Sequence, residues 1–339
     1  MSDNQKKMGI GILVTMLCAV AFYFLYWVKT PVYSLNIIKD SIKKHDMATF
    51  EKHVDMDTIY SKAFDDCMIA MDRIQGEDTL SNPFTLGIIQ MIKPTVVSVL
   101  KQQSMEYIMG EKESQDNKIT KANKMANNIR EKAALDKSEL KDISVISKEG
   151  DVSFVAIKIY NRQLTKDFDI KVKMTKLEDG TWKLREVTNL VDFLIACDKA
   201  KKAKLAEINK PIVEELKNAL LTNCQMKLKN DGNPYFTSYW LACEFSFKNN
   251  STKDISGFYS NVSVVNKNGK VLKTKGLKYT SETIKSGMSE ELFYKADLNQ
   301  FISNEKLIID NPYDKKLVVD VYEIRYTDGK VVRLINELP

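Results

Sequence analysis

The sequence is organised around MGIGILVTMLCAVAFYFLYWV, residues Met8 to Val28. This stretch contains no charged side chain, and lysines flank it on both sides at Lys6, Lys7 and Lys29. With a rise of about 1.5 Å per residue, a helix of this length reaches roughly 30 Å, the thickness of a bilayer's hydrocarbon core. Aromatic side chains gather at its C-terminal end, as is typical of a headgroup boundary. The sequence therefore predicts a transmembrane helix.

A cleavable signal peptide is the competing interpretation of this stretch. The small residues Ala19-Val20-Ala21 fit the rule for a cleavage site. However, the apolar run Phe22 to Val28 follows them, and cleavage would leave it exposed at the start of the mature chain. An uncleaved signal-anchor accounts for that run, so we favour membrane attachment through Met8 to Val28.

The tail before the anchor is short, and it carries Lys6 and Lys7. Because positive residues are retained in the cytoplasm, these lysines favour a cytoplasmic N-terminus. Lysines also follow the anchor, at Lys29, Lys39 and Lys43, but large folded domains are translocated largely regardless of charge. We expect a single-pass protein of the bacterial cell envelope with its bulk outside the cytoplasm.

The composition describes a globular chain, with 44% hydrophobic and 28% charged residues among 339. The net charge of +6 is spread along the chain and forms no basic stripe, so a nucleic-acid partner is not expected. Two histidines and five cysteines without a C-x-x-C pair give little support to a metal site. About 310 residues follow the tail and anchor, residues 1–29, and are enough for two domains.

The first soluble domain is predicted over residues 30–189. Apolar residues at helical spacing begin after Thr30-Pro31, and Asp46 and then Asp55 or Asp57 can cap the following helices. Asn82-Pro83 starts a further helix, which Pro94 should kink or end. Residues 110–141 are polar, either a long exposed helix or a mobile excursion.

From Ile143 the apolar period changes to two, and Asp179-Gly180 predicts a two-residue hairpin. Helices followed by an antiparallel meander predict an α+β domain with the helices on one face of the sheet.

Several short motifs in this region carry a resemblance: Tyr26-Trp27, Thr30 to Leu35, His45-Asp46, Phe50 to Lys52, Val54-Asp55, Ile92-Lys93-Pro94 and Gly180 to Leu184. With these motifs, residues 26–195 resemble a bacterial membrane-anchored family known as domain of unknown function 2939. The resemblance implies an anchored domain with no assigned activity.

The remaining chain predicts a helical spacer over residues 190–221 and an immunoglobulin-like β-sandwich over residues 222–339. The spacer includes a basic run between Lys199 and Lys204, which we interpret mainly as a solvated helix face, with a membrane-surface contact as the alternative. In the sandwich, Asn268-Gly269 is the strongest hairpin signal, and Asp328-Gly329 predicts a closing hairpin. If the first turn centres on Asn233-Pro234, Cys224 and Cys243 face each other across a hairpin. Their pairing in a disulfide and their burial as two free thiols both remain open.

Few residues with acid–base side chains lie close together in the sequence: His45-Asp46, His53-x-Asp55-x-Asp57 and Asp65-Asp66. In the two clusters that contain histidine, the aspartates lie where helix caps are needed. Asp65 and Asp66 are neighbours on a predicted helix, where successive side chains point about 100° apart, so we interpret them as a solvated edge. No phosphate-binding loop, nucleophile elbow or zinc-protease motif occurs. We therefore expect no catalytic, cofactor-binding or metal-binding residues, and no cofactor.

These observations predict a non-enzymatic, membrane-anchored interaction or scaffold protein that contacts an unknown protein through sandwich loops or edges. The alternative is a module that binds an apolar ligand or lipid at the cell envelope; an enzyme ranks third. A pocket lined by methionine and aromatic side chains would favour ligand binding. An exposed apolar surface on the sandwich, without such a pocket, would favour the interaction protein.

Overall fold

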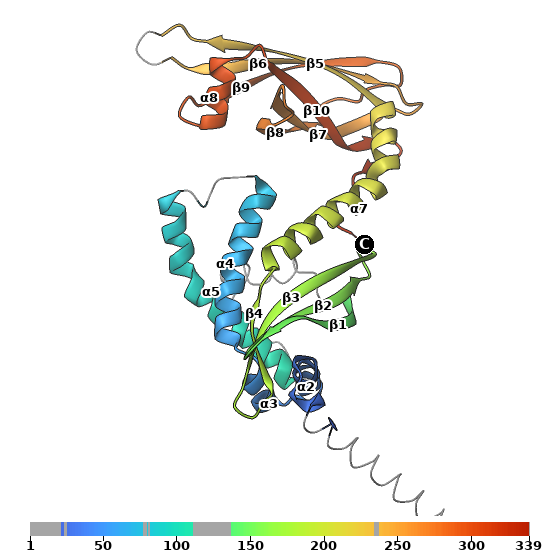
Figure 1. Ribbon diagram of the computed structural model, residues 1–339. Coiled ribbons are helices and arrows are strands. Elements are labelled where there is room, and N and C mark those ends of the chain that lie inside the picture. The colour runs from blue at the N-terminus through green and yellow to red at the C-terminus, as the bar shows by residue number, and fades with distance from the viewer. Residues whose placement is uncertain are drawn as a thin grey trace, which may run out of the picture. The chain divides into compact units, whose positions relative to one another are not determined.

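The computed structural model describes residues 22–23, 26–76, 80, 82–110, 137–233 and 237–338. Most of the predicted anchor, Met8 to Val28, and most of the polar stretch 110–141 lie outside these residues. The chain divides into two compact units, one ending at Lys202 and the other running from Ala203 to Leu338 (Figure 1).

Unit 1 begins with helices, whose starts follow the capping rules. Side-chain oxygens of Thr30, Asp46, Asp55 and Asn82 each accept a hydrogen bond from a backbone N–H of the first turn. Asp55, rather than Asp57, therefore caps the third predicted helix. The elements are η1 (Trp27–Lys29), α2 (Pro31–Lys44), α3 (Met47–His53), α4 (Met56–Gln75) and α5 (Pro83–Met109).

The sequence predicted that Pro94 kinks or ends its helix. Helix α5 continues through Pro94, so the second of these alternatives is wrong. Proline removes one backbone N–H from the helix. Contacts with α4 around Pro94 offset this loss. Helix α5 lies beside α4 (Figure 1), and the Lys93 ammonium of α5 lies 2.7 Å from the Asp65 carboxylate of α4. Val96 in the next turn is fully buried.

The rest of unit 1 is an antiparallel sheet in the order β1-β2-β3-β4. Its strands are β1 (Ser138–Glu149), β2 (Val152–Asn161), β3 (Lys166–Lys176) and β4 (Trp182–Val187). The sheet contributes Val155, Val172 and Met174 to a core that α2 and α3 complete with Leu35, Ile38 and Phe50. The predicted order of helices followed by an antiparallel meander is confirmed.

Helix α7 (Leu190–Ala219) leads into the second unit, which is built from two antiparallel sheets. One sheet has the order β5-β6-β9 and the other β11-β10-β7-β8. The elements are β5 (Leu220–Asn230), β6 (Tyr239–Asn249), β7 (Ile255–Asn266), β8 (Val271–Tyr279), β9 (Ser289–Leu298), α8 (Ser303–Asp310), β10 (Lys315–Tyr326) and β11 (Val331–Arg333). Phe247, Phe258 and Ile324 from both sheets meet in one core.

The predicted hairpins form, but their loops are longer than two residues. Gly180, Gly269 and Gly329 each adopt a positive φ of 78–88°, and each donates its N–H to the carbonyl three residues earlier. A second bond, such as the one from Asn266 N–H to Lys270 O (3.0 Å), closes the loop across three residues. This is a turn followed by a glycine bulge, and it needs glycine at the third loop position because the backbone is left-handed there.

Cys224 and Cys243 are free thiols, so the disulfide alternative is wrong. In the ladder of β5 and β6, Cys224 lies opposite Phe245 and Cys243 lies opposite Met226. The predicted turn centre was one residue too early, and this shift moves the two cysteines from a direct to a diagonal arrangement. Cys243 is buried, which raises its thiol pKa to about 11, and Cys224 is half-buried.

The last turn of α7 and the first residue of β5 belong to the core of the second unit. Leu216 of α7 and Leu220 of β5 are almost fully buried there, beside Ala219. We expect a fragment that starts at Ala203 to be more stable than one that starts at Thr222. Loss of the two leucines should lower the free energy of unfolding by about 3 kcal/mol or more. Urea unfolding of both fragments tests this, and equal midpoints would contradict it.

Glu323 of β10 is buried between two guanidinium groups, those of Arg333 and Arg325. Hydrogen bonding to Arg333 lowers the carboxyl pKa; burial opposes this shift, and the bond to Arg325 adds to it. The resulting stabilisation is present above the unfolded-state pKa of about 4.3 and is lost as the pH falls through the lower folded-state value.

Glu323→Gln should therefore destabilise the second unit by about 1–3 kcal/mol at pH 7 and by less below about pH 4. Urea unfolding at both pH values provides the measurement. The exposed Glu291→Gln is the control and should change stability little at either pH. If the difference in unfolding free energy between wild type and Glu323→Gln is the same at both pH values, the ionised Glu323 carboxylate is not the source of the stabilisation.

Candidate functional site

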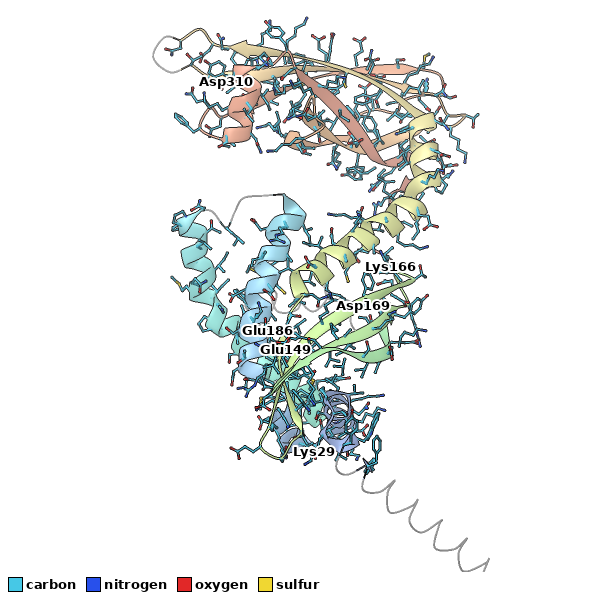
Figure 2. The ribbon with its side chains drawn as sticks, in the orientation of Figure 1. Lys29, Glu149, Lys166, Asp169, Glu186 and Asp310 are labelled. Carbon is cyan, nitrogen blue, oxygen red and sulfur yellow. The ribbon has the colours of Figure 1, made fainter. Side chains whose placement is uncertain are left out.

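Trp182 joins the start of the described chain to the last strand of the first sheet. Its side chain is fully buried, and its indole Nε1–H donates to the carbonyl of Lys29 (2.9 Å). Its backbone N–H donates to Ser34 Oγ (2.9 Å), and its carbonyl accepts from His53 Nδ1–H (3.1 Å). We call these contacts of Trp182 with Lys29, Ser34 and His53 the Trp182 clamp. Two of the short motifs contribute to it: Ser34 lies within Thr30 to Leu35, and Trp182 lies within Gly180 to Leu184. Lys29 lies at the end of unit 1 where α2 and α3 are found (Figures 1 and 2).

The two histidines have packing roles. His45 ends α2 with a positive φ of 57°, and its Nδ1–H donates to the carbonyl of Ile108 (2.8 Å). Gly110 lies against this imidazole so closely that a Cβ there would approach Cε1 to 2.8 Å. His53 is buried against Trp182. Both rings therefore hold elements of unit 1 together.

The aspartates of the sequence clusters form caps and ion pairs. Asp46 caps α3; Asp55 caps α4 and pairs with Arg185. Burial raises the pKa of Asp55, but the Arg185 guanidinium and the Thr58 amide outweigh it, so the pKa is lowered overall. Three further ion pairs are Asp57–Lys101, Asp65–Lys93 and Asp66–Lys62. In the described part of the chain, no group of three or more His, Cys, Asp or Glu side chains could hold a metal ion.

Helix α5 exposes an unusual amount of apolar surface. Phe84 and Met91 are 76% and 78% exposed, and Leu86 and Ile88 are also exposed. Among the described residues, α5 is the helix whose length and composition would allow it to cross a membrane. Its second half is fixed within unit 1 by buried Val96 and Ile108, while its first half projects to the tip of the α4–α5 pair (Figure 1).

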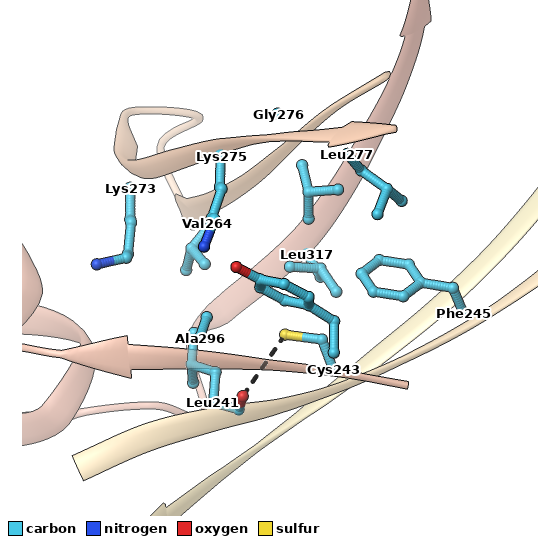
Figure 3. Close-up of a pocket in the computed structure, with 12 residues that line it drawn as sticks. Leu241, Cys243, Phe245, Val264, Lys273, Lys275, Gly276, Leu277, Ala296 and Leu317 are labelled. Carbon is cyan, nitrogen blue, oxygen red and sulfur yellow. Dashed lines mark hydrogen bonds between the residues drawn. The ribbon is translucent and has the colours of Figure 1, made fainter. Parts of the chain in front are cut away.

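The interior of the sandwich contains a small cavity. Apolar side chains, among them Leu241, Phe245 and Val264, line it, with Lys273 and Lys275 on one side (Figure 3). Its volume is about 30 Å³, room for roughly two water molecules. The Lys275 ammonium lies over the Tyr294 ring, 4.7 Å from its centroid. This cavity is too small to enclose a lipid or a drug-sized ligand.

A larger, open groove of about 660 Å³ follows the edge of β5. One wall is Cys224 to Lys229, and the other is the segment Pro312 to Leu317, without Asp314. Met226, Leu228 and Leu317 give it an apolar floor next to the core. Tyr313, which is 97% exposed, lies on the opposite wall, and the Cys224 thiol donates to the Leu317 carbonyl across the groove (3.4 Å).

The groove is basic. Four of its lining residues are lysines and none is acidic: Lys227, Lys229, Lys315 and Lys316. Lys315 is neutralised by Asp314 and donates to the carbonyl of Asn311 (2.9 Å). Lys227, Lys229 and Lys316 are exposed, and no ion pair involving them is found in the part of the chain that the structure describes. The groove therefore combines an apolar floor with a positive rim.

Sequence reasoning did not locate this groove. The alternation Met226-Lys227-Leu228-Lys229 is the available signal, because lysines on the outer face are typical of an edge strand. The opposite wall, Pro312 to Leu317, lies more than eighty residues further along the chain, and no spacing rule connects the two.

Comparisons with known proteins give no family. No family model matches the chain, and no curated protein matches it. One similar solved structure is described as "X-ray structure of Northeast Structural Genomics Consortium target SoR45". It is 12% identical, and the match covers 34% of this chain and 80% of that one, with a TM-score of 0.25.

Removal of the indole N–H in Trp182→Phe should loosen the clamp on Lys29. The Lys29 carbonyl would lose its buried donor, which should cost about 1–3 kcal/mol of stability in unit 1. Trypsin should then cleave after the exposed Lys29 several-fold faster. Trp240→Phe, at a half-buried tryptophan of the second unit, serves as the control. Equal cleavage rates in wild type and Trp182→Phe would contradict the role of the clamp.

Proposed function

We propose that the chain is a membrane-anchored, non-enzymatic interaction protein of the cell envelope, which presents its second unit to a protein partner outside the cytoplasm. The groove between β5 and Pro312–Leu317 is the observation that carries the proposal. It is open, apolar at its floor and basic at its rim. Such a surface suits a polypeptide partner better than a small molecule that needs enclosure.

The protein acts by holding its second unit at the membrane surface, where a protein partner can bind it. The anchor Met8 to Val28 fixes the protein to the membrane with its N-terminus in the cytoplasm. The Trp182 clamp begins at Lys29, directly after the anchor, so no free linker separates the membrane from unit 1. Helix α7 then carries the chain into the second unit.

The family assignment of both units is part of the proposal. The motifs around Trp182 support a unit 1 of the domain of unknown function 2939 type. The sheet orders β5-β6-β9 and β11-β10-β7-β8, with one shared core, support an immunoglobulin-like sandwich. Domains of this class commonly act in recognition through loops and strand edges.

The alternative, an apolar-ligand module, has less support. The cavity of about 30 Å³ in the sandwich is an order of magnitude below the size of ordinary ligand pockets. Exposed apolar side chains on the second unit, such as Phe301 and Tyr313, instead favour contacts with another protein. The exposed first half of α5 is a second apolar surface with the same implication.

Photo-crosslinking in intact cells tests the proposal. A photoreactive amino acid replaces Tyr313 in the groove or, as the matched control, Phe301 outside it; the two aromatics are 97% and 88% exposed. We expect a discrete protein adduct from position 313 and little or none from position 301. Absence of an adduct at 313, or equal adducts at both positions, would overturn the groove as the interaction site.

A further inference from the structure

We propose that the free edge of β5 binds an extended, acidic segment of another protein, which adds to the sheet β5-β6-β9 as a further strand. This inference rests on the proposed function and names the class of partner. The edge is unpaired, its free backbone groups face the groove, the flanking side chains select an acidic partner, and self-pairing is disfavoured.

β5 is the outer strand of its sheet, with β6 as its ladder partner over the whole length from Leu220 to Asn230. Within the described residues, no backbone hydrogen bond joins β5 to β10, although the two strands lie close together. A thiol, that of Cys224, instead reaches the Leu317 carbonyl. The outer edge of β5 therefore keeps its backbone donors and acceptors available.

Alternate residues of β5 direct their backbone N–H and C=O groups away from β6. At the two ends of the ladder, Asn250 N–H donates to Ala219 O (2.9 Å) and Asp231 N–H donates to Ser238 O (3.3 Å). In antiparallel strands alternate residues direct both backbone groups to the same neighbour. The odd-numbered residues of β5 thus face β6, and Cys224, Met226 and Leu228 face outward. These three residues also line the groove.

The side chains of β5 determine which residues an added strand would carry. The groove wall from Cys224 to Lys229 spans roughly 17 Å, enough for a strand of about six residues. On an added strand, residues beside Met226 and Leu228 would point to the core and would be apolar. Residues beside Lys227 and Lys229 would point to solvent, where glutamate or aspartate forms cross-strand ion pairs. The groove therefore fits a segment that alternates apolar and acidic residues.

A second copy of the chain is disfavoured as the occupant of this edge. Pairing of two β5 edges would bring Lys227 and Lys229 of one copy next to the same lysines of the other. Like charges opposed across strands are destabilising, and edge lysines are a known protection against self-association. An acidic partner removes this repulsion and gains the ion pairs instead.

The test uses the full-length protein in detergent micelles and fluorescent peptides of about six residues that alternate valine with glutamate or valine with lysine. We expect the glutamate peptide to bind about tenfold more tightly than the lysine peptide, since two or three exposed ion pairs are formed. The double variant Lys227→Glu, Lys229→Glu should reverse this preference. Equal binding of both peptides would show that the lysines only protect the edge, and would overturn the acidic specificity.

Hydrogen exchange at single-residue resolution locates the bound strand. The amides of Met226 and Leu228 should exchange at least about tenfold more slowly with the glutamate peptide present, while those of Gln225 and Lys227, already bonded to β6, should not change. Met226→Pro removes an outward N–H without breaking the ladder to β6, so it should abolish binding. Met226→Ala keeps the N–H and controls for loss of the side chain.

Unchanged exchange at Met226 and Leu228, or equal binding by Met226→Pro and Met226→Ala, would overturn strand addition. A partner that still crosslinks at position 313 would then show that the groove is used in another way. Failure of both experiments would remove the proposed function as well.

Discussion

The burial of Trp182 is the constraint on which the first unit depends. A fully buried indole and its backbone must find partners for every N–H and C=O, because an unpaired buried group costs about 1–3 kcal/mol. The partners come from η1, α2 and α3, more than 120 residues earlier in the chain: Lys29 O, Ser34 Oγ and His53 Nδ1. The helices and the sheet are therefore fixed to each other at the point where the chain leaves the predicted membrane segment.

Local rules predicted much of the fold. Asp46, Asp55 and Asn82 cap helices because a short polar side chain can reach the free N–H groups of the first turn. Glycine at positions 180, 269 and 329 marked hairpins because only glycine takes a left-handed turn at no cost. These signals do not fix loop length, however. An error of one residue in the first turn of the sandwich was enough to misplace Cys224 opposite Cys243.

Tertiary context decided what local rules could not. Pro94 would end an isolated helix, but contacts with α4 keep α5 intact around it. The His45-Asp46 and His53–Asp57 clusters are close in sequence, yet each side chain points to a different partner. The two walls of the groove, in contrast, are far apart in the sequence and close together in the fold. β5 and Pro312–Leu317 meet because the two sheets share a core. The alternating lysines of β5 were visible in the sequence, but the opposite wall was not.

An exposed strand edge can pair with the edge of another copy of the chain and cause aggregation. Lysines on the outer face of β5 discourage pairing between identical edges and leave the edge open to an acidic strand. The same lysines thus protect the edge against self-association and select an acidic partner. Recognition through the backbone of an edge strand tolerates a range of partner side chains, provided that charge and apolar residues alternate in register.

We propose that the second unit recognises its partner through the edge of β5. The decisive experiment is a structure of the full-length protein in complex with the partner captured from cells. We expect an extended partner segment hydrogen-bonded to the backbone of Met226 and Leu228, with acidic side chains beside Lys227 and Lys229. A partner bound elsewhere, with the edge of β5 still open, would contradict it.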